Sequence, residues 1–347
     1  MSGKVAIITG TTGALGLAIA KRLIEETPED VKLTIVATSR TFPSVKNAIT
    51  DIRTFVETNY AHRKELVEFD YLVFDQCNMV SVLSAAYDIR KRYKHIDYLF
   101  LNSSYMQFAK IDYVQAFFDM FKYPLKAFTV GTFKVQGVSR RTDDGMSCMF
   151  QANVLAPWYL INEIIPQLSG GGRVVWISTS ISMPEYFDPN DLGIDTNEKG
   201  YEASKYEMEM MHCAAQKHLY EKHGIESWLI HPGVFVSTSS VFTSLSIFAM
   251  VGMYFMFYLC RIMGSVDHCI SPWKAASAPV FCALKADRET NDPFLKYGSS
   301  VGRLGGEFVS NKALTRRYED TIYEFVEKKR LEWQQKFKNQ IIERDRY

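Results

Sequence analysis

Short runs of apolar and β-branched residues alternate with helix-like stretches over the first hundred residues of the chain. Residues 4–10, 32–39, 68–75 and 97–102 have the composition of buried strands. Residues 14–26, 44–60 and 80–93 have the spacing and residue types of helices. Successive parallel strands need a crossover connection, usually a helix, whereas antiparallel strands can be joined by a tight turn. The alternation therefore predicts an α/β fold with a doubly wound, mainly parallel sheet.

The alternation is interrupted once and then resumes. Residues 108–145 contain Pro124, three glycines and a charged stretch, so we expect a helix there followed by an irregular insertion. Beyond it we predict helices over 146–168 and 201–223 and strands over 173–178 and 226–231. A final helix is expected over about 318–344, where Lys and Glu at i,i+4 spacing suit a solvated face.

A glycine-rich turn joins the first expected strand to the first expected helix. It contains Gly10, Gly13 and Gly16, with Thr11 and Leu15 between them. Glycine at a strand end lets the backbone turn tightly and approach a pyrophosphate, and the N–H groups at the start of the following helix stabilise the anion. Because the turn follows a strand and opens a helix, we predict that these five residues bind a dinucleotide. The alternative is an ordinary strand-to-helix turn.

The residues that end the second and third strands indicate which dinucleotide binds. The second strand ends in Ser39 and Arg40. An acidic residue at this place holds the ribose 2′-hydroxyl of NAD, whereas an arginine suits the 2′-phosphate of NADP. We therefore expect NADPH, with a solvated loop charge as the other interpretation of Arg40. Asp75 is placed either to accept a hydrogen bond from the adenine amino group or to cap the next helix.

Tyr201 and Lys205 form the strongest candidate for catalysis. Residues four apart lie on one face of a helix, and this pair opens the helix between the fifth and sixth strands. An ammonium beside a phenol favours the phenolate, so we expect the pKa of Tyr201 to fall below its usual value of about 10. Such a tyrosine would be a good proton donor to a carbonyl. An exposed helical pair is the alternative.

Together these motifs resemble those of the short-chain dehydrogenase/reductase family, over roughly residues 4–240. The matching parts, in the family's order, are the glycine loop 10–16, Asp75, Leu101-Asn102-Ser103-Ser104 in place of N-N-A-G, Asn153, Ser178-Thr179-Ser180, Tyr201 with Lys205, and Pro232-Gly233. Two departures are notable. Ala14 replaces a loop glycine, and Thr179 stands where the family usually has its catalytic serine.

The resemblance implies a role for each matching residue. Tyr201 would donate the proton, Lys205 would also bind the nicotinamide ribose, and Asn153 would hold a water of the proton relay. A hydroxyl of Ser178 or Thr179, or alternatively of Ser180, would bond the carbonyl oxygen. The cofactor-binding residues would be Gly10, Thr11, Gly13, Leu15, Gly16, Ser39, Arg40, Asp75, Asn102, Tyr201, Lys205, Val234, Phe235 and Ser237.

A narrower resemblance spans the whole chain. Residues 175–178, 201–205, 231–235, 273–280, 296–299 and 328–333 look like the corresponding stretches of the fungal 3-keto-steroid reductases of ergosterol synthesis. It implies NADPH-dependent reduction of the 3-keto group of a 4-demethylated sterol to the 3β-alcohol. It also implies association with lanosterol synthase and other sterol-pathway enzymes. The alternatives are reduction of another hydrophobic ketone, such as a 17-keto steroid or an acyl ketone, or a non-catalytic scaffold.

Residues 234–260 carry no charge, which is the most unusual feature of the C-terminal third. The stretch 242–259 is long enough to span a bilayer, to line a sterol pocket that dips into the membrane, or to form protein core. We favour the pocket, with Phe248, Met253 and Phe257 facing lipid. The expected architecture is thus a catalytic domain over 1–240 and a membrane-facing extension of the same domain over 241–347. Its expected location is the cytosolic face of the endoplasmic reticulum membrane and lipid droplets.

Composition and charge limit the remaining possibilities. The 40 basic and 39 acidic residues give a net charge of +1, which argues against nucleic acid as a partner. The six cysteines form no C-x-x-C pair and have no histidine cluster beside them, so we expect no metal site. The N-terminus shows no secretory signal, and cysteines scattered in this way suit a reducing compartment, where they act as small buried apolar side chains.

Overall fold

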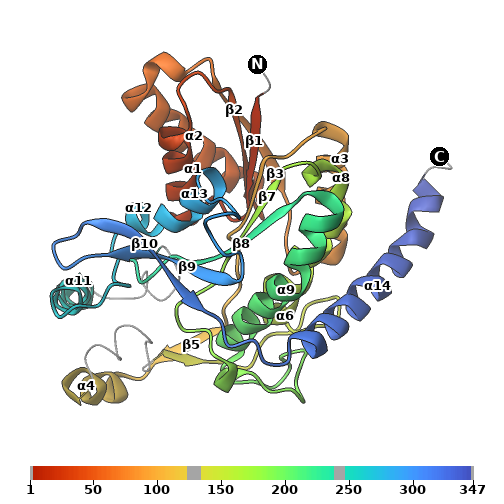
Figure 1. Cartoon of the computed structure of the whole chain (residues 1–347). Helices are drawn as coiled ribbons and strands as arrows, with labels where there is room; N and C mark the ends of the chain where they lie inside the picture. Colours follow the sequence, from red (N-terminus) through yellow and green to blue (C-terminus); the bar gives the residue numbers. More distant parts are fainter. Residues whose placement is uncertain (1–2, 123–133, 238–246, 345–347) are drawn as a thin grey trace.

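A mainly parallel eight-stranded sheet forms the centre of the molecule (Figure 1). The computed structural model describes residues 3–122, 134–237 and 247–344. The strand order is β10-β9-β8-β7-β4-β1-β2-β3, and every neighbouring pair is parallel except β9 and β10. The strands are β1 Lys4–Ile8, β2 Leu33–Ser39, β3 Val67–Val73, β4 Tyr98–Leu101, β7 Arg173–Ile177, β8 Glu226–His231, β9 Leu295–Val301 and β10 Glu307–Ala313. The predicted α/β fold is confirmed.

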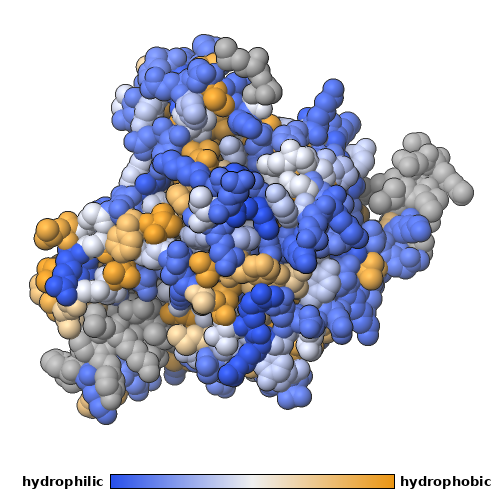
Figure 2. Space-filling model, viewed as in Figure 1, coloured by the Kyte–Doolittle hydropathy of each residue, from blue (hydrophilic) through white to orange (hydrophobic). Residues whose placement is uncertain are grey.

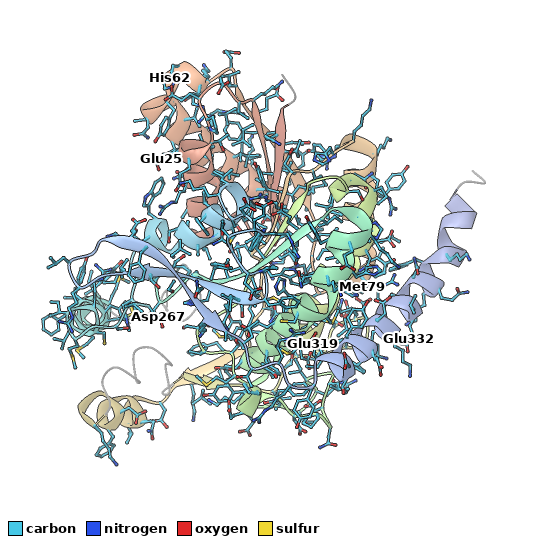
Figure 3. The ribbon with its side chains drawn as sticks, viewed as in Figure 1. Glu25, His62, Met79, Asp267, Glu319 and Glu332 are labelled. Atoms are coloured by element: carbon cyan, nitrogen blue, oxygen red, sulfur yellow. The ribbon has the colours of Figure 1, made fainter. Side chains whose placement is uncertain are left out.

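Helices cover both faces of the sheet. The longer ones are α1 Ala14–Glu26, α2 Phe42–Asn59, α3 Met79–Arg92, α9 Gly200–His223, α11 Ile247–Ile262, α13 Ser277–Leu284 and α14 Glu319–Arg344. Shorter helical segments are η1 Ala61–Arg63, η3 Pro184–Tyr186 and α12 Pro272–Ala275. The last helix, α14, packs along α9, and Figure 3 labels Glu319 and Glu332 on it.

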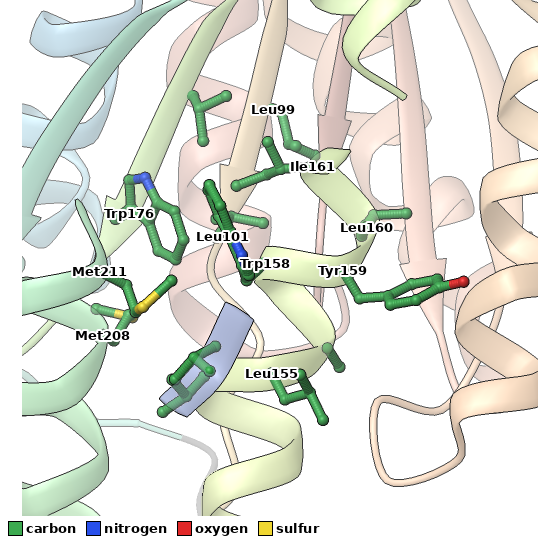
Figure 4. Packing of buried hydrophobic residues seen from close by; sticks show 14 of the residues in the cluster. Leu99, Leu101, Leu155, Trp158, Tyr159, Leu160, Ile161, Trp176, Met208 and Met211 are labelled. Atoms are coloured by element: carbon green, nitrogen blue, oxygen red, sulfur yellow. The ribbon is translucent and has the colours of Figure 1, made fainter. Parts of the chain in front are cut away.

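Two hydrophobic clusters lie on opposite faces of the sheet because successive strand residues point to opposite sides. Ala6 and Ile8 of β1 belong to the cluster under α1, α2 and α13. Ile7, between them, belongs to the cluster under α3, α9 and helix α7 Ala156–Glu163, where Trp158, Trp176 and Met211 also pack (Figure 4). A strand buried on both faces reads as a continuous apolar run, which explains why the sequence of β1 shows no alternation.

The segment predicted as one helix over 146–168 is interrupted. It consists of α6 Cys148–Phe150, a π-helical turn η2 Gln151–Leu155, α7 Ala156–Glu163 and α8 Ile165–Leu168. Pro157 has no N–H to donate to the carbonyl four residues earlier, and the N–H of Ala156 bonds the Gln151 carbonyl five residues earlier. The single-helix prediction is therefore wrong at the place where Asn153 lies.

Strands β9 and β10 are absent from the sequence prediction. β9 continues the parallel sheet beside β8, and β10 closes that edge as an antiparallel strand. Gly298 interrupts the strand pattern of β9, yet a Cβ there would collide with the imidazole of His231 on β8. The glycine is thus required by close packing that only the folded sheet creates.

The insertion over 108–145 is more ordered than expected. β5 Phe108–Ile111 and β6 Lys134–Gln136 form a small antiparallel sheet, and α4 Tyr113–Lys122 lies between them in the chain. The expected helix is confirmed, whereas β5 and β6 correct the irregular description. Residues 123–133 of this segment lie outside the described ranges.

The uncharged segment contains α11, a helix of 16 residues. Within residues 3–122, 134–237 and 247–344, no helix combines the length and apolar character needed to cross a membrane. Residues 242–246 of the stretch considered for spanning lie outside these ranges. Phe257, expected to face lipid, is instead buried and packs against the His268 ring at 5.4 Å between centroids. Met253 is partly exposed.

Candidate active site

The predicted site residues gather at the carboxyl ends of the parallel strands. Strand β4 lies on one side of β1 and β2 on the other, so the order of strands reverses at β1. Ligands of doubly wound sheets bind in the crevice at such a reversal. The glycine loop follows β1, Arg40 follows β2, Asn102 follows β4 and the hydroxyl-bearing residues follow β7. The topology therefore brings together segments far apart in the sequence.

The glycine loop has the geometry expected for an anion site. Gly10 has a φ of +67°, and a Cβ on Gly16 would collide with the Gly10 carbonyl oxygen. Gly13 precedes α1 without a capping side chain, and the first turn of α1 holds no acidic residue. The N–H groups of that turn are thus available to a phosphate. Ala14, which replaces a family glycine, lies partly exposed at the start of α1 and is accommodated.

Three of the predicted cofactor residues support the loop from within. Leu15 is buried in the core under α1. The Thr11 hydroxyl donates to the Ile8 carbonyl at 2.6 Å. The Asn102 amide nitrogen donates to the carbonyls of Thr9 at 2.9 Å and Gly10 at 3.2 Å. In this structure all three residues therefore hold the backbone of the glycine loop in place.

The end of β2 carries a cation suited to a phosphate. Arg40 is exposed and, within the described residues, takes part in no ion pair or hydrogen bond. Ser39 beside it is partly exposed. A guanidinium with its donors free can bind a phosphate through two parallel hydrogen bonds. Together with the open turn of α1, this arrangement fits NADP.

Asp75 does not cap the helix that follows it. The cap of α3 is Asn78, whose side chain accepts from the Ser81 N–H at 2.9 Å. Asp75 accepts instead from the Cys77 N–H at 2.9 Å through Oδ1. The capping interpretation is therefore wrong, and adenine binding by Asp75 stays a prediction.

Tyr201 is held at the start of α9 by a residue that sequence reasoning missed. The Gln136 amide oxygen on β6 accepts from the Tyr201 N–H at 3.1 Å, and its nitrogen donates to the Glu202 carboxylate at 2.5 Å. Gln136 lies 65 residues away in the segment expected to be irregular. The sequence carries no signal that would have paired it with Tyr201.

The pKa of Tyr201 is the clearest disagreement with the sequence prediction. Burial raises this pKa to about 12, with the charge of Glu202 adding to the rise and a hydrogen bond with Ser104 opposing it. The Lys205 ammonium lies 5.9 Å from the Tyr201 ring centroid and donates to the Ile177 carbonyl at 2.8 Å. Burial in turn lowers the pKa of Lys205 to about 8. The expected lowering of the tyrosine pKa is therefore not seen.

Asn153 links the loop after β4 to α9. Its Oδ1 accepts from the Tyr105 N–H at 2.7 Å, and its Nδ2 donates to the Tyr105 carbonyl and the Ser204 hydroxyl, both at 2.8 Å. The side chain is 1 % exposed and lies in the π-helical turn. Through Ser204, three residues after Tyr201, these contacts hold α9 in place. The role of Asn153 in holding a water stays a prediction.

The three candidate hydroxyls after β7 differ in their surroundings. Ser178 is buried, and its hydroxyl donates to the Glu209 carboxylate. Thr179 and Ser180 are partly exposed, and the Thr179 hydroxyl accepts from the Ile181 N–H at the long distance of 3.4 Å. A hydroxyl that donates to a carboxylate cannot also donate to a ketone. The structure thus favours Thr179 or Ser180 over Ser178.

Residues 234–237, expected to contact the cofactor, pair with the segment after α11. The Val234 N–H donates to the carbonyl of Asp267, which Figure 3 labels, at 2.6 Å, and Val236 donates to Ile270 at 3.0 Å. Phe235 forms an isolated parallel bridge with Ile270. The backbone donors of Val234 and Val236 are therefore used within the chain. Phe235 and Ser237 remain partly exposed at the same edge.

Comparison with known proteins gives a consistent result. No family model matches the chain. It is 41 % identical over 344 residues to the 3-keto-steroid reductase of Saccharomyces cerevisiae, covering 99 % of both chains. It is 40 % identical over 338 residues to the enzyme of the same name from Candida albicans, covering 97 % of this chain and 96 % of that one. The chain belongs to the fungal 3-keto-steroid reductases.

Solved structures support the fold of this 3-keto-steroid reductase family member. YwfH, an NADPH-dependent reductase involved in bacilysin biosynthesis, superposes with a TM-score of 0.58 at 13 % identity, covering 88 % of this chain and all of that one. L-sorbose reductase from Gluconobacter frateurii, in complex with NADPH and L-sorbose, gives 0.56 at 17 % identity, covering 82 % and 91 %. At these identities the likeness shows the fold alone.

Proposed function

We propose that the chain reduces the 3-keto group of a 4-demethylated sterol to the 3β-alcohol, with NADPH as cofactor, in the C4 demethylation steps of ergosterol synthesis. The observation that carries the proposal is full-length similarity to 3-keto-steroid reductases together with Tyr201, Lys205 and a hydroxyl-bearing turn at one sheet edge. When bound, NADPH supplies the hydride that adds to the ketone carbon. The turn over Gly10, Gly13 and Gly16 would present the N–H groups at the start of α1 to its pyrophosphate, and Arg40 would bind its 2′-phosphate.

The chain's own residues would stabilise and protonate the ketone oxygen. Thr179 or Ser180 would donate a hydrogen bond to that oxygen as negative charge develops on it. Tyr201 would donate the proton that completes the alcohol. A pKa of about 12 keeps its phenol protonated at neutral pH, which is the form that reduction requires. Lys205 would hold the ribose while its ammonium remains charged.

The pH dependence of reduction should follow Lys205 rather than Tyr201. The lowered pKa of Lys205, about 8, means that its ammonium is present below that pH and is lost as the pH rises through it. We expect kcat/KM for the ketone to be level near neutral pH and to fall with an apparent pKa near 8, measured between about pH 6 and pH 10. A profile that stays level to the upper limit would contradict this assignment.

Arg40 should determine the choice of cofactor. A charge-assisted contact to a phosphate contributes roughly 1.5–3 kcal/mol. Arg40→Asp should therefore raise the KM for NADPH about tenfold or more and narrow the preference over NADH, while kcat at saturating NADPH stays near the unmutated value. Steady-state kinetics with both cofactors tests this. Equal use of NADPH and NADH by the unmutated enzyme would contradict the role of Arg40.

A panel of ketones separates the proposed substrate from its alternatives. The purified chain with NADPH should reduce 4-demethylated 3-keto sterols in preference to a 17-keto steroid or a long-chain acyl ketone. Preference for either of the other ketones would identify a different reductase. No turnover of any ketone, by a chain that binds NADPH, would favour the scaffold.

We also propose that α11 and α4 rest on a membrane surface at the cytosolic face of the endoplasmic reticulum or on a lipid droplet. Along α11 the side chains of Ile247, Val251, Phe255, Tyr258 and Ile262 are 51–71 % exposed and recur every three or four residues. Val114 and Phe118 of α4 are also exposed. Figure 1 draws both helices on the side away from α14, and Figure 2 shows apolar residues gathered over α11.

The exposed apolar residues of α11, which we call the α11 stripe, are better explained by contact with a lipid surface than by contact with water. The first charged residue after residue 246 is Arg261, and its guanidinium is turned inward to the carbonyls of His268 and Cys269. The exposed face of α11 is thus apolar over four turns. Transferring a large apolar side chain fully from water into an apolar environment is favourable by about 1.5–3 kcal/mol. Several of them acting together would hold a protein at an interface without a spanning helix.

Charged substitutions on the α11 stripe should release the protein from membranes. Val251→Glu/Phe255→Glu should abolish flotation with phosphatidylcholine vesicles, because carboxylates resist leaving water. Tyr87→Glu is the matched control, since Tyr87 is 58 % exposed on α3, distant from α11 in Figure 1. It should float like the unmutated chain. Equal flotation of all three proteins, or of none, would contradict membrane docking by this face.

Association with lanosterol synthase and other sterol-pathway enzymes is the remaining part of the proposal, and the family resemblance supports it. Such enzymes share apolar substrates, so a common membrane surface would bring them together. Cross-linking in intact microsomes, compared with the Val251→Glu/Phe255→Glu variant, tests whether contact depends on the shared surface.

A further inference from the structure

A buried ion pair lies directly behind the hydroxyl-bearing segment. Lys296 on β9 and Glu209 on α9 are 2.6 Å apart between Nζ and Oε1, and their side chains are 1 % and 2 % exposed. Desolvating two charges is costly unless further hydrogen bonds use their remaining donors and lone pairs. Neither residue belongs to the predicted site. The pair therefore needs an explanation in terms of what else it touches.

The further hydrogen bonds of this pair go to residues 178–182, which we call the hydroxyl turn. The Lys296 ammonium donates to the Thr179 carbonyl at 3.1 Å and to the Ser182 hydroxyl at 2.9 Å. The hydroxyls of Ser178 and Ser182 donate to the Glu209 carboxylate. Three of the five residues of the turn are thus bonded to one buried pair.

Two more ammonium groups hold the backbone on either side. Lys205 donates to the Ile177 carbonyl at 2.8 Å, and Lys312 of β10 donates to the Ser180 carbonyl at 3.3 Å. The hydroxyl turn itself belongs to no helix or strand. Its position is therefore fixed from outside, by α9 and by the β9–β10 hairpin that extends the sheet edge.

We propose that Lys296 and Glu209 are positioning residues that hold the hydroxyl turn where Thr179 or Ser180 can bond the ketone oxygen. The inference rests on the proposed ketone reduction. A displacement of about 1 Å in a reacting geometry can cost about 10²-fold in rate. A buried ion pair with no net charge can fix a turn in this way through its hydrogen bonds, because the backbone of the turn lacks the regular hydrogen bonds of a helix or strand.

The test uses Lys296→Met/Glu209→Gln, which removes both charges together and leaves no isolated buried charge. We expect kcat for ketone reduction to fall about 10–100-fold with the KM for NADPH unchanged. The isotope effect on kcat with NADPH deuterated at the transferred position should rise, because the hydride step becomes slower relative to binding and release. Amide hydrogen exchange across 178–182 should become faster. Ser182→Ala, a milder change in the same network, should show a smaller loss of kcat in the same direction.

Ser227→Ala is the matched control. Ser227 is buried on β8 and bonds Trp176 Nε1 at 3.0 Å and His212 Nδ1 at 2.9 Å, neither of which belongs to the hydroxyl turn or to the Lys296–Glu209 pair. It should lower the melting temperature while kcat and exchange across 178–182 stay unchanged.

Unchanged exchange in the folded double variant would overturn the positioning role, whatever the activity. Faster exchange with unchanged kcat and isotope effect would overturn its link to catalysis. Absence of ketone reduction by the unmutated chain would instead contradict the proposed function.

Discussion

Tyr201→Phe should lower kcat for ketone reduction by about 10²–10⁴-fold and leave the affinity for NADPH nearly intact. The substitution removes only the hydroxyl that donates the proton, and the ring that packs at the start of α9 is kept. Its backbone contact with Gln136 is unaffected, because Gln136 accepts from the Tyr201 N–H. Single-turnover kinetics and fluorescence titration of NADPH measure the two quantities separately.

Tyr206→Phe provides the control for this change. Tyr206 lies on the same helix, is buried, and bonds the carbonyls of Thr315 and Arg317 at 3.0 and 2.8 Å. Loss of its hydroxyl should lower stability by about 1–3 kcal/mol and leave kcat unchanged. If Tyr201→Phe kept most of its activity, another group would have to donate the proton and the assigned mechanism would be wrong.

The second large effect is expected at Thr179. Thr179→Val keeps the shape of the side chain and removes its donor, so turnover should fall about 10²–10³-fold, the range for losing one donor to a developing oxyanion. Ser180→Ala should then cost little. Steady-state kinetics of both variants with a 3-keto sterol measures the difference.

The reverse pattern would move the role to Ser180. Ser178→Ala serves as the comparison within the same turn, because the Ser178 hydroxyl is directed to Glu209 and buried. We expect it to affect stability more than turnover. A loss of turnover confined to Ser178→Ala would contradict the assignment of the carbonyl-binding hydroxyl to the exposed side of the turn.

Local patterns in the sequence were sufficient for six strands of the central sheet, β1–β4, β7 and β8, and for the glycine loop. Helix α1 begins and ends at the predicted residues, Ala14 and Glu26. Gly10 has the left-handed backbone of the tight turn that was predicted, whereas Gly16 is required by its close approach to the Gly10 carbonyl oxygen within the loop. These features depend on neighbours close in sequence, so propensity and spacing carry them.

Features that depend on distant contacts were not predictable. Gln136 meets Tyr201 across 65 residues, and Lys296 meets Glu209 across 87. Strand β9 holds Lys, Gly and Ser among its residues, and only its place beside β8 makes it a strand. The direction of the Tyr201 pKa shift was also missed, because spacing places Lys205 near the phenol but does not reveal the desolvation that raises the tyrosine pKa and lowers the lysine pKa.

The most direct measurement follows the fate of the transferred hydrogen. The purified chain is incubated with a 4-demethylated 3-keto sterol and NADPH deuterated at the transferred position, and the product is analysed by mass spectrometry and chromatography against both 3-hydroxy epimers. The account predicts a single product, the 3β-alcohol carrying one deuterium at C3, and none from Tyr201→Phe. A chain that binds NADPH yet forms no 3-hydroxysterol, or that forms it equally well without Tyr201, would contradict the account.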